Sequence, residues 1–361
     1  MTKQETKYFS TSQISCYRGC KREWSYKYQE RLKPRAVTRS LYMGSTLHKL
    51  LEIRANGLSW QEYLEQEVKP TYDKMSSADQ ESLGLDFIEC CYNIMKQYDW
   101  MWGNENIKYL ATEVKIDLKI KGRKRFLGFV DAIVEVDGDQ YIMEHKSFKT
   151  TKMSMDQTWI NQQTCLYAKA LNSMGYNIKG VLWDMIKTAS YKPPRILKDG
   201  SFGKQYGDQT IMSFLDVGLN IEDIPKAVYE DIKDNHLNFL DRYYTPIFPA
   251  VVDAVWNDFV ETVNEICKNK SQARTLGKDC DWCEYKELCK TELTGGDVEY
   301  TKQLYFTNPL QREKDIMEEF KKTPWCQNCQ KLAKEYGAEI DFNQCCLRCE
   351  EYNKYKGGEK Q

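Results

Sequence analysis

The chain has 361 residues, enough for two or three domains at roughly 150 residues each. Hydrophobic residues make up 41% of the sequence and aromatic residues 13%, which excludes a disordered or low-complexity protein. The net charge of −1 argues against a general polycation for nucleic acid but leaves room for local basic patches. Because no apolar stretch approaches the length of a membrane span and the polar start lacks a signal segment, we expect a soluble intracellular protein without a membrane partner.

The first hundred residues are predicted to be largely helical. Residues 10–56 have a helical pattern with short loops, one of them at Met43-Gly44, and residues 59–101 contain two or more amphipathic helices. Cys90 and Cys91 fall inside the second of these regions, and we expect them to be core residues rather than metal ligands.

At about residue 110 the hydrophobic period changes to two. Apolar and charged residues alternate over 114–120, which predicts a half-buried strand. Asp137-Gly138 is a strong signal for a two-residue hairpin turn between two further strands. The predicted elements from there on are strands at 126–136 and 139–148, a helix at 155–173, a buried strand at 179–187, a polar loop at 192–207, and helices at 210–241 and 250–270. A mixed sheet with helices before and after it predicts an α/β fold.

The predicted hairpin brings two carboxylates together. If Asp137 and Gly138 form the turn, Asp131 lies directly opposite Glu144, and Lys146 shares the face of Glu144. Two carboxylates this close repel each other unless a cation lies between them, and a hard divalent ion such as Mg²⁺ is the natural candidate. A lysine beside the ion can orient a water molecule or stabilise charge on a phosphate.

An isolated pattern of this kind also fits a surface cluster of ion pairs. Gly128, which leaves out a side chain near the carboxylates, fits the close approach of a ligand backbone. Gln163 and Tyr167 lie four residues apart on one face of the following predicted helix, where they could act on the site or simply pack in the core.

Several motifs, taken in order along the chain, resemble the RecB-like branch of the PD-(D/E)XK nucleases. They are Ser10 to Ile14 with Cys20 to Tyr26, Gly44 to His48, Gly128-Phe-Val-Asp131, Glu144-His-Lys146, Gln163 to Tyr167, and Cys280 to Cys283 with Cys289. The sequence departs from the pattern at Lys21, where a proline is usual, and at Glu144, where aspartate is commoner. The loop from Lys187 to Gly200 resembles that of phage exonucleases in particular, and the resemblance implies CRISPR-associated RecB-like exonucleases and AddB-type nuclease domains as further relatives.

The resemblance implies a restriction-endonuclease-like core and roles for its motif residues. His48, Asp131 and Glu144 would hold Mg²⁺ or Mn²⁺, together with the backbone carbonyl that follows Glu144. Lys146 would position the attacking water. Gln163 and Tyr167 would orient Lys146 or the DNA backbone.

The resemblance also implies an iron–sulfur cluster, of the 4Fe-4S type, in the cysteine-rich part of the chain. Cys280, Cys283 and Cys289 supply only three thiolates, whereas a closed cluster needs four. Cys20 is the fourth ligand in the family, and Cys16, one helical turn away, is the alternative. Zn²⁺ bound by the same ligands is the competing interpretation.

The C-terminal tail has its own metal-binding signature. Two Cys-x-x-Cys pairs are separated by the spacing of a zinc ribbon, which predicts a Zn²⁺ site formed by Cys326, Cys329, Cys346 and Cys349. Cys345 is a spare thiol. The tail is not a general feature of the family, so its role is open, with stabilisation of the terminus as the default.

The predicted organisation has three parts. They are a helical region at 1–107, a nuclease core at 108–295 and the zinc-ribbon-like tail at 296–361. Contacts to DNA phosphates are expected from the basic stretch 18–39 and the turn after the first long strand, in particular from Arg22, Arg123, Lys124 and Arg125.

The resulting prediction is a Mg²⁺- or Mn²⁺-dependent exonuclease that acts on DNA with free ends, single-stranded or duplex. It would work in phage or prokaryotic DNA processing or recombination, in the cytoplasm of a prokaryotic cell or phage-infected host, and could act with a helicase or recombination protein. A structure-specific endonuclease on the same fold and a non-catalytic, cysteine-stapled nucleic-acid-binding module are the alternatives.

Overall fold

The computed structural model describes residues 6–149, 155–203 and 206–308. The chain divides into two compact units, the first made of residues 1–15 and 37–270 and the second of residues 16–36 and 271–361. The four cysteines of the predicted zinc ribbon lie outside the described residues, and the predicted boundaries at 107 and 295 stay predictions. None of the helices that the structure describes is both long and apolar enough to cross a membrane.

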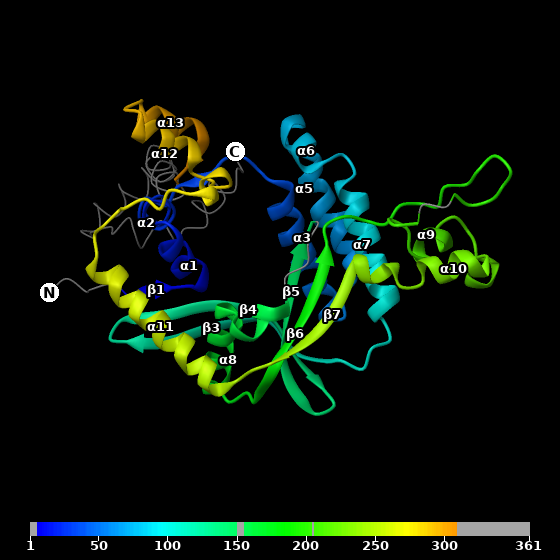
Figure 1. The fold of residues 1–361 in the computed structure, drawn as a ribbon, viewed down its shortest axis with the longest axis horizontal. Coiled ribbons are helices and arrows are strands. Elements are labelled where there is room, and N and C mark those ends of the chain that lie inside the picture. The colour runs from blue at the N-terminus through cyan, green and yellow to red at the C-terminus, as the bar shows by residue number, and fades with distance from the viewer. Residues whose placement is uncertain (1–5, 150–154, 204–205, 309–361) are drawn as a thin grey trace, which may run out of the picture. The chain divides into compact units, whose positions relative to one another are not determined.

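A six-stranded mixed sheet forms the centre of the first unit (Figure 1). The strands follow the order β1-β4-β5-β6-β7, and β3 pairs along the other edge of β4. β1 pairs with the start of β4 and β5 with its end, so that residues 127–131 of β4 have no strand partner on that edge within the described chain. The strand bounds are β1 Lys7–Phe9, β3 Lys108–Lys121, β4 Lys124–Val136, β5 Asp139–Phe148, β6 Ile178–Lys187 and β7 Leu240–Pro246.

Helices cover both faces of this sheet (Figure 1). Trp183 of β6 packs in one cluster with residues of α8 and α11, whereas Ile186 packs in another with residues of α3 and α7. Trp183 and Ile186 are an odd number of residues apart, so their side chains point to opposite faces of the sheet. The two helix pairs therefore lie on opposite faces. The main helices are α3 Arg39–Ala55, α7 Phe87–Trp102, α8 Gln162–Ser173 and α11 Pro249–Lys268, and the shorter ones are α4 Trp60–Tyr63, α5 Lys69–Asp73, α6 Ser77–Leu83, α9 Ile211–Leu215 and α10 Lys226–Ile232.

The second unit has a small aromatic core of its own. Tyr285 stacks on Phe306 with ring centroids 5.2 Å apart, and Tyr26, Leu32 and Leu288 complete the cluster. The N-terminal and C-terminal segments of this unit also pair as strands. Its elements are α2 Lys21–Trp24, the π-helical turn Ser25–Gln29, β2 Lys33–Pro34, α12 Lys286–Leu293, α13 Val298–Tyr305 and β8 Phe306–Thr307, and α1 Thr11–Gly19 contains the border between the two units.

The predicted loop at Met43-Gly44 is wrong, because both residues lie inside α3. Gly44 lowers the helix propensity of this segment, but its missing side chain has a packing reason. A Cβ atom at Gly44 would lie 3.2 Å from the Ser147 hydroxyl oxygen. The glycine therefore lets α3 approach the end of β5, where the Glu144-His-Lys146 motif ends.

The helices predicted over 210–241 are confirmed only in part. The structure has only α9, α10 and short 3₁₀ turns there, followed by the strand β7, which the sequence analysis missed. Arg242 in β7 is a charge that hydrophobic patterning assigns to the surface, yet its side chain is only 6% exposed because it pairs with Asp184. The strands predicted at 126–136, 139–148 and 179–187 and the helix at 250–270 are confirmed within one or two residues.

Gly128 makes room for a side chain of the protein itself. A Cβ atom at this position would lie 2.6 Å from the Cε1 atom of Tyr167 in α8. The interpretation that Gly128 admits a ligand backbone is therefore replaced by a packing role, in which the glycine lets the Tyr167 ring lie against β4.

This close approach predicts the effect of a single methyl group. Gly128→Ala should lower the free energy of unfolding by about 1–3 kcal/mol, because the ring of Tyr167 has to move to relieve the overlap. Urea unfolding followed by circular dichroism measures the change. Gly19→Ala is the matched control, since a Cβ there meets nothing within 4 Å. Equal stability of the two variants would contradict the packing role.

Candidate active site

The β4–β5 hairpin has the predicted register. Val136 pairs with Asp139, and the pairing continues to Ala132 and Met143. Asp137 and Gly138 both have positive φ angles, as a two-residue turn of type I′ requires. At the next residue of β4 the pairing with β5 has ended. There the side-chain carboxylate of Asp131, instead of a backbone carbonyl, accepts a hydrogen bond of 2.8 Å from the His145 N–H.

Lys146 links Glu144 to helix α8. Its Nζ atom donates to Glu144 Oε1 at 2.7 Å and to Gln163 Oε1 at 3.1 Å. Gln163 in turn donates through Nε2 to the Tyr167 hydroxyl at 3.2 Å. Asn161 caps the helix by accepting a hydrogen bond from the Thr164 N–H, which fixes the start of α8 next to this chain of contacts. The structure thus brings together all four of the predicted site residues on β5 and α8.

His48 reaches Asp131 from helix α3. Its Nδ1 atom lies 3.3 Å from Asp131 Oδ1. The ring also packs edge-on against the ring of His145, with centroids 5.8 Å apart. The predicted histidine and the predicted aspartate are therefore in direct contact, although they are 83 residues apart in the sequence.

The two carboxyl groups have pKa values shifted in opposite directions. Burial raises the pKa of Glu144 to about 7, and the charge of Asp131 adds to the rise. Burial also opposes ionisation of Asp131, but the hydrogen bond and charge of His48 and the charge of His145 outweigh it and lower the pKa. Burial opposes charge on His48 as well, yet Asp131 raises its pKa overall. The site therefore holds one firmly ionised carboxylate beside one that titrates near neutral pH.

One buried oxygen of the site has no partner. Glu144 is 1% exposed, and its Oε2 atom makes no hydrogen bond with any residue that the structure describes. Leaving such an oxygen unpaired costs free energy that a bound cation would recover. Within the described residues, no three His, Cys, Asp or Glu side chains are already gathered around a common point for a metal. The carboxylate oxygens of Asp131 and Glu144 nevertheless suit Mg²⁺ or Mn²⁺, and the imidazole of His48 is a plausible ligand for Mn²⁺ but an uncommon one for Mg²⁺.

Glu113 is a neighbour of the site that the sequence analysis missed. The β3–β4 pairing passes from Thr112–Ala132 to Val114–Val130, which places Glu113 opposite Asp131. Its φ angle of +47° lies in the left-handed region that non-glycine residues rarely adopt. Burial, and then the charge of Asp131, raise its pKa. Nothing in the alternating pattern of residues 114–120 indicates the left-handed backbone conformation of Glu113.

The four cysteines of the predicted cluster all belong to the second unit. Cys283 and Cys289 pack against its aromatic core. Burial raises the pKa of Cys283 to about 11. Arg274 Nε lies 3.3 Å from Cys289 Sγ. Cys16, the alternative ligand, has its pKa raised to about 12, first by burial.

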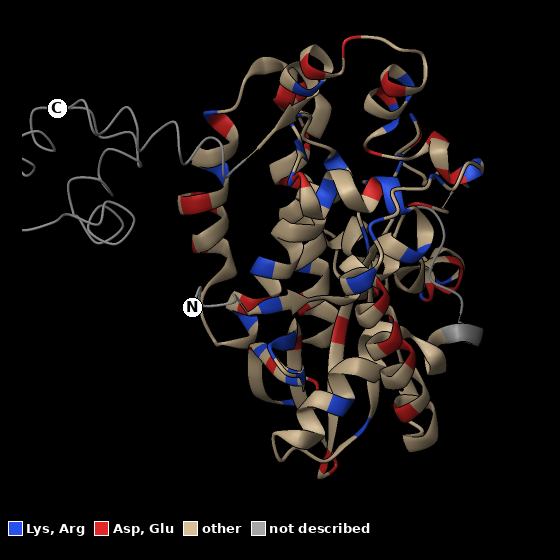
Figure 2. Cartoon of the chain, turned by 90° about the vertical axis from the view of Figure 1, so that its left-hand side faces the viewer, with Lys and Arg blue, Asp and Glu red and all other residues tan. Residues whose placement is uncertain are grey.

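The basic residues predicted to contact DNA have partners within the protein. Arg22 donates to Glu292 at 2.9 Å, and its side chain is only 12% exposed. Lys124 donates to Asn264 and Arg125 pairs with Asp117, while Arg123 has interactions of its own. Both signs of charge are interspersed along the elements visible in Figure 2. The DNA-binding role of these residues stays a prediction.

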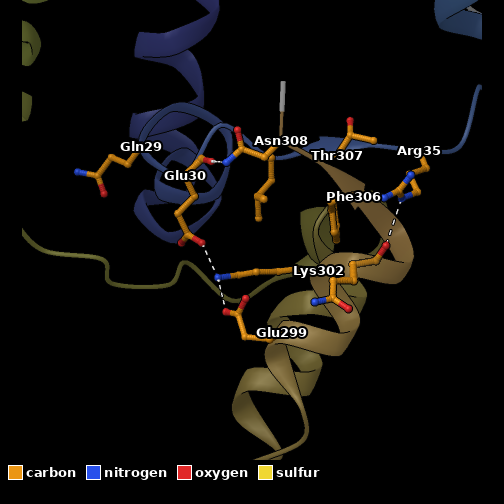
Figure 3. Close-up of a pocket in the computed structure, with 10 residues that line it drawn as sticks. Gln29, Glu30, Arg35, Glu299, Lys302, Phe306, Thr307 and Asn308 are labelled. Atoms are coloured by element: carbon orange, nitrogen blue, oxygen red, sulfur yellow. Dashed lines mark hydrogen bonds and ion pairs between the residues drawn. The ribbon is translucent and has the colours of Figure 1, made fainter. Parts of the chain in front are cut away.

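A large cavity lies in the second unit and is separate from these residues. Its volume is about 1060 Å³, and its lining includes Glu30, Arg35, Lys302 and Phe306. Lys302 pairs with Glu30 at 2.8 Å and with Glu299 at 3.1 Å (Figure 3). The charges of its wall therefore compensate one another, and none of the predicted site residues lines it.

Comparison with known proteins identifies the family. The sequence profile of the PD-(D/E)XK nuclease superfamily matches residues 8–290, a range that contains the carboxylates, the lysine and the cysteine triplet. The chain belongs to this superfamily. Membership in the PD-(D/E)XK nucleases implies nuclease activity, and these enzymes generally use Mg²⁺ or Mn²⁺.

One of the similar solved structures is the crystal structure of SSO0001. It shares 12% sequence identity with this PD-(D/E)XK protein at a TM-score of 0.32, and the match covers 80% of this chain and 88% of that one. A search among curated proteins returned no match.

The raised pKa of Glu144 predicts how the stability of this PD-(D/E)XK protein depends on pH. The folded-state pKa of about 7 lies above the ordinary value of 4.5, so the contribution of Glu144 is complete below pH 4.5 and is lost as the pH rises through 7. Without metal, the free energy of unfolding should therefore fall over this range, by on the order of 2–3 kcal/mol from this group. Urea unfolding at pH 5 and pH 8 in a chelator measures the fall.

Glu144→Gln is the matched variant, because it keeps the shape of the side chain and removes the titration. Its unfolding free energy should change less between pH 5 and pH 8 than that of the wild type. The same pH dependence in both proteins would contradict the shifted pKa.

Proposed function

We propose that this protein is a metal-dependent DNA exonuclease whose active site is formed by Asp131, Glu144 and Lys146. The observation that carries the proposal is the buried, unpartnered Oε2 atom of Glu144 beside the ionised Asp131. His48, Asp131 and Glu144 would hold Mg²⁺ or Mn²⁺, with the backbone carbonyl after Glu144. When bound, the cation would favour hydroxide formation from water and offset negative charge in the transition state.

Among the described residues, two acceptors bind the ammonium group of Lys146, which leaves one N–H for the reaction. Its ammonium group has three N–H bonds, and Glu144 and Gln163 accept two hydrogen bonds from it. The side chain is 30% exposed, so the third N–H can reach a water molecule or a phosphate oxygen. Gln163, held by Tyr167, keeps the ammonium group in place. These contacts give Gln163 and Tyr167 positioning roles.

The preference for DNA ends rests on the order of the motifs, which is that of RecB-like exonucleases. DNA processing or recombination in a prokaryotic or phage-infected cytoplasm, with a helicase or recombination protein as partner, follows from the same resemblance. A structure-specific endonuclease would use the same residues. A non-catalytic binding module would have no need of the chain of contacts from Glu144 through Lys146 to Tyr167, which argues against that alternative.

The second unit would hold an iron–sulfur cluster through Cys20, Cys280, Cys283 and Cys289. Their common location and the hydrogen bond from Arg274 to Cys289 support this set. Zn²⁺ at the same ligands is the alternative. A Zn²⁺ site at Cys326, Cys329, Cys346 and Cys349 is proposed on their spacing alone.

The nuclease proposal predicts cleavage that depends on Lys146. The wild type should degrade end-labelled linear DNA in Mg²⁺ or Mn²⁺, and Lys146→Ala should reduce the rate by about 100-fold or more, because the group that orients the water is lost. Gel analysis of linear and closed circular DNA in parallel measures both rate and mode.

Lys169→Ala is the matched control, since Lys169 is a lysine of α8 that pairs with Asp253 on the surface. It should retain wild-type activity. Cleavage of closed circles would favour the endonuclease, and full activity of Lys146→Ala would contradict the site assignment.

The cysteine proposal predicts a coloured protein. Anaerobically purified wild type should show broad visible absorbance and contain about four iron atoms per chain. Cys283→Ser should lose most of this absorbance, whereas Cys267→Ser should not, because Cys267 is an exposed cysteine outside the set. A colourless protein with stoichiometric zinc would replace the iron–sulfur assignment by a zinc site.

A further inference from the structure

A row of charged and polar residues crosses the sheet next to the proposed metal site. In the strand register, His145 of β5 lies opposite Asp184 of β6, and Asp184 lies opposite Arg242 of β7. Asp184 is 1% exposed and His145 5% exposed. Tyr98 of α7, which is completely buried, covers the middle of the row.

Asp184 is the centre of this row. Its Oδ2 atom contacts His145 Nδ1 at 2.7 Å and accepts from the Tyr98 hydroxyl at 2.6 Å. Its Oδ1 atom accepts from Arg242 Nε at 2.6 Å. Both oxygens of a fully buried carboxylate are thus satisfied, and each partner comes from a different element.

The outer end of the row is equally well held. Arg242 also donates to Glu105 and to the Tyr98 hydroxyl. Its guanidinium lies over the Trp102 ring, 4.4 Å from the centroid. Burying such charges is no more favourable than packing apolar residues of the same volume, so the row calls for a role other than stability.

The inner end of the row contacts the proposed metal site at two points. The main-chain N–H of His145 donates to Asp131 Oδ2, and the His145 ring packs against the ring of His48. In the proposed function His145 offers its backbone carbonyl to the cation, whereas its side chain is not a ligand. It does touch two of the three side chains that would hold the cation.

Asp184 also selects the form of His145. Burial opposes ionisation of Asp184. The charge of Arg242 and the hydrogen bond from His145 outweigh burial, and they hold the pKa of Asp184 well below its ordinary value. An ionised Asp184 can only accept, so the proton of His145 lies on Nδ1. The ring orientation is then fixed by a charge-assisted hydrogen bond.

We propose that Asp184 is a positioning residue for the metal site. By holding His145 through its ring, it keeps the Asp131 carboxylate and the His48 imidazole in the arrangement that binds one divalent cation. Residues that orient metal ligands through hydrogen bonds typically change metal affinity by about 10–100-fold when they are replaced. The inference rests on the proposed function, because it assumes that Asp131 and His48 are ligands.

The test measures Mn²⁺ affinity of the full chain, without DNA, by electron paramagnetic resonance titration of free Mn²⁺. Asp184→Asn keeps the shape of the side chain but not its charge, and it should weaken Mn²⁺ binding about 10-fold or more. Tyr98→Phe removes one hydrogen bond to Asp184 and should weaken Mn²⁺ binding about 2–10-fold. This variant provides the test if Asp184→Asn does not fold. Thr245→Val is the control, because Thr245 is a buried hydrogen-bonding residue of β7 that contacts Trp183 and Thr158 instead.

A second readout separates positioning from general stability. The chain has three histidines, so imidazole ¹⁵N spectra can be assigned with His236→Gln and His48→Gln. The wild type should show His145 protonated on Nδ1, and Asp184→Asn should alter this signal while Thr245→Val should not. Unchanged Mn²⁺ affinity in both Asp184→Asn and Tyr98→Phe, with normal binding by the wild type, would overturn this inference alone. Absence of Mn²⁺ binding by the wild type would overturn the proposed metal site as well.

Discussion

The burial of two carboxyl groups at one point of the sheet is the constraint on which the rest of this structure depends. Glu144 is buried and Asp131 largely so, with 15% of its side chain exposed, and the charge of Asp131 raises the pKa of Glu144. The fold tolerates this pair because each carboxyl group has a cationic or N–H partner, His48 and His145 for Asp131 and Lys146 for Glu144. The remaining oxygen of Glu144 has no hydrogen-bond partner among the described residues.

The position of the pair follows from the sheet. β4 has β3 along one edge, while β1 and β5 share the other edge and leave residues 127–131 between them. In that gap a side chain can replace a backbone partner, as Asp131 does, and a ring can lie against the strand, as Tyr167 does at Gly128. Helices α3 and α8 then supply His48 and Gln163 to the same place.

Much of this site could be predicted from the sequence because a two-residue turn fixes the register of a hairpin. Once Asp137-Gly138 is the turn, the relation of Asp131 to Glu144 and Lys146 follows from counting. The row behind the site could not be predicted in the same way. Arg242 is a charge that patterning assigns to the surface, and its burial depends on Asp184, 58 residues away. The available signal for the row was Asp184, a single acidic residue within the buried strand predicted at 179–187.

The cysteines illustrate a different limit. Three thiolates near the C-terminal end of the matched region demand a fourth from elsewhere, and the structure places Cys20 in the same compact unit as the other three. Chain topology explains this, because residues 16–36 leave the nuclease unit to join residues beyond 270. The spacing does not distinguish an iron–sulfur cluster from zinc, since both use the same thiolates.

The central claim is that Asp131 and Glu144 form a cation site whose second carboxyl group is largely protonated below neutral pH. Calorimetric titration of the metal-free protein with Mn²⁺, repeated in buffers of different ionisation enthalpy, counts the protons that binding releases. The account predicts that binding releases protons at pH 6 and almost none above pH 8, and that Glu144→Gln releases fewer at pH 6. Absence of binding, or a proton count that does not change between these pH values, would contradict it.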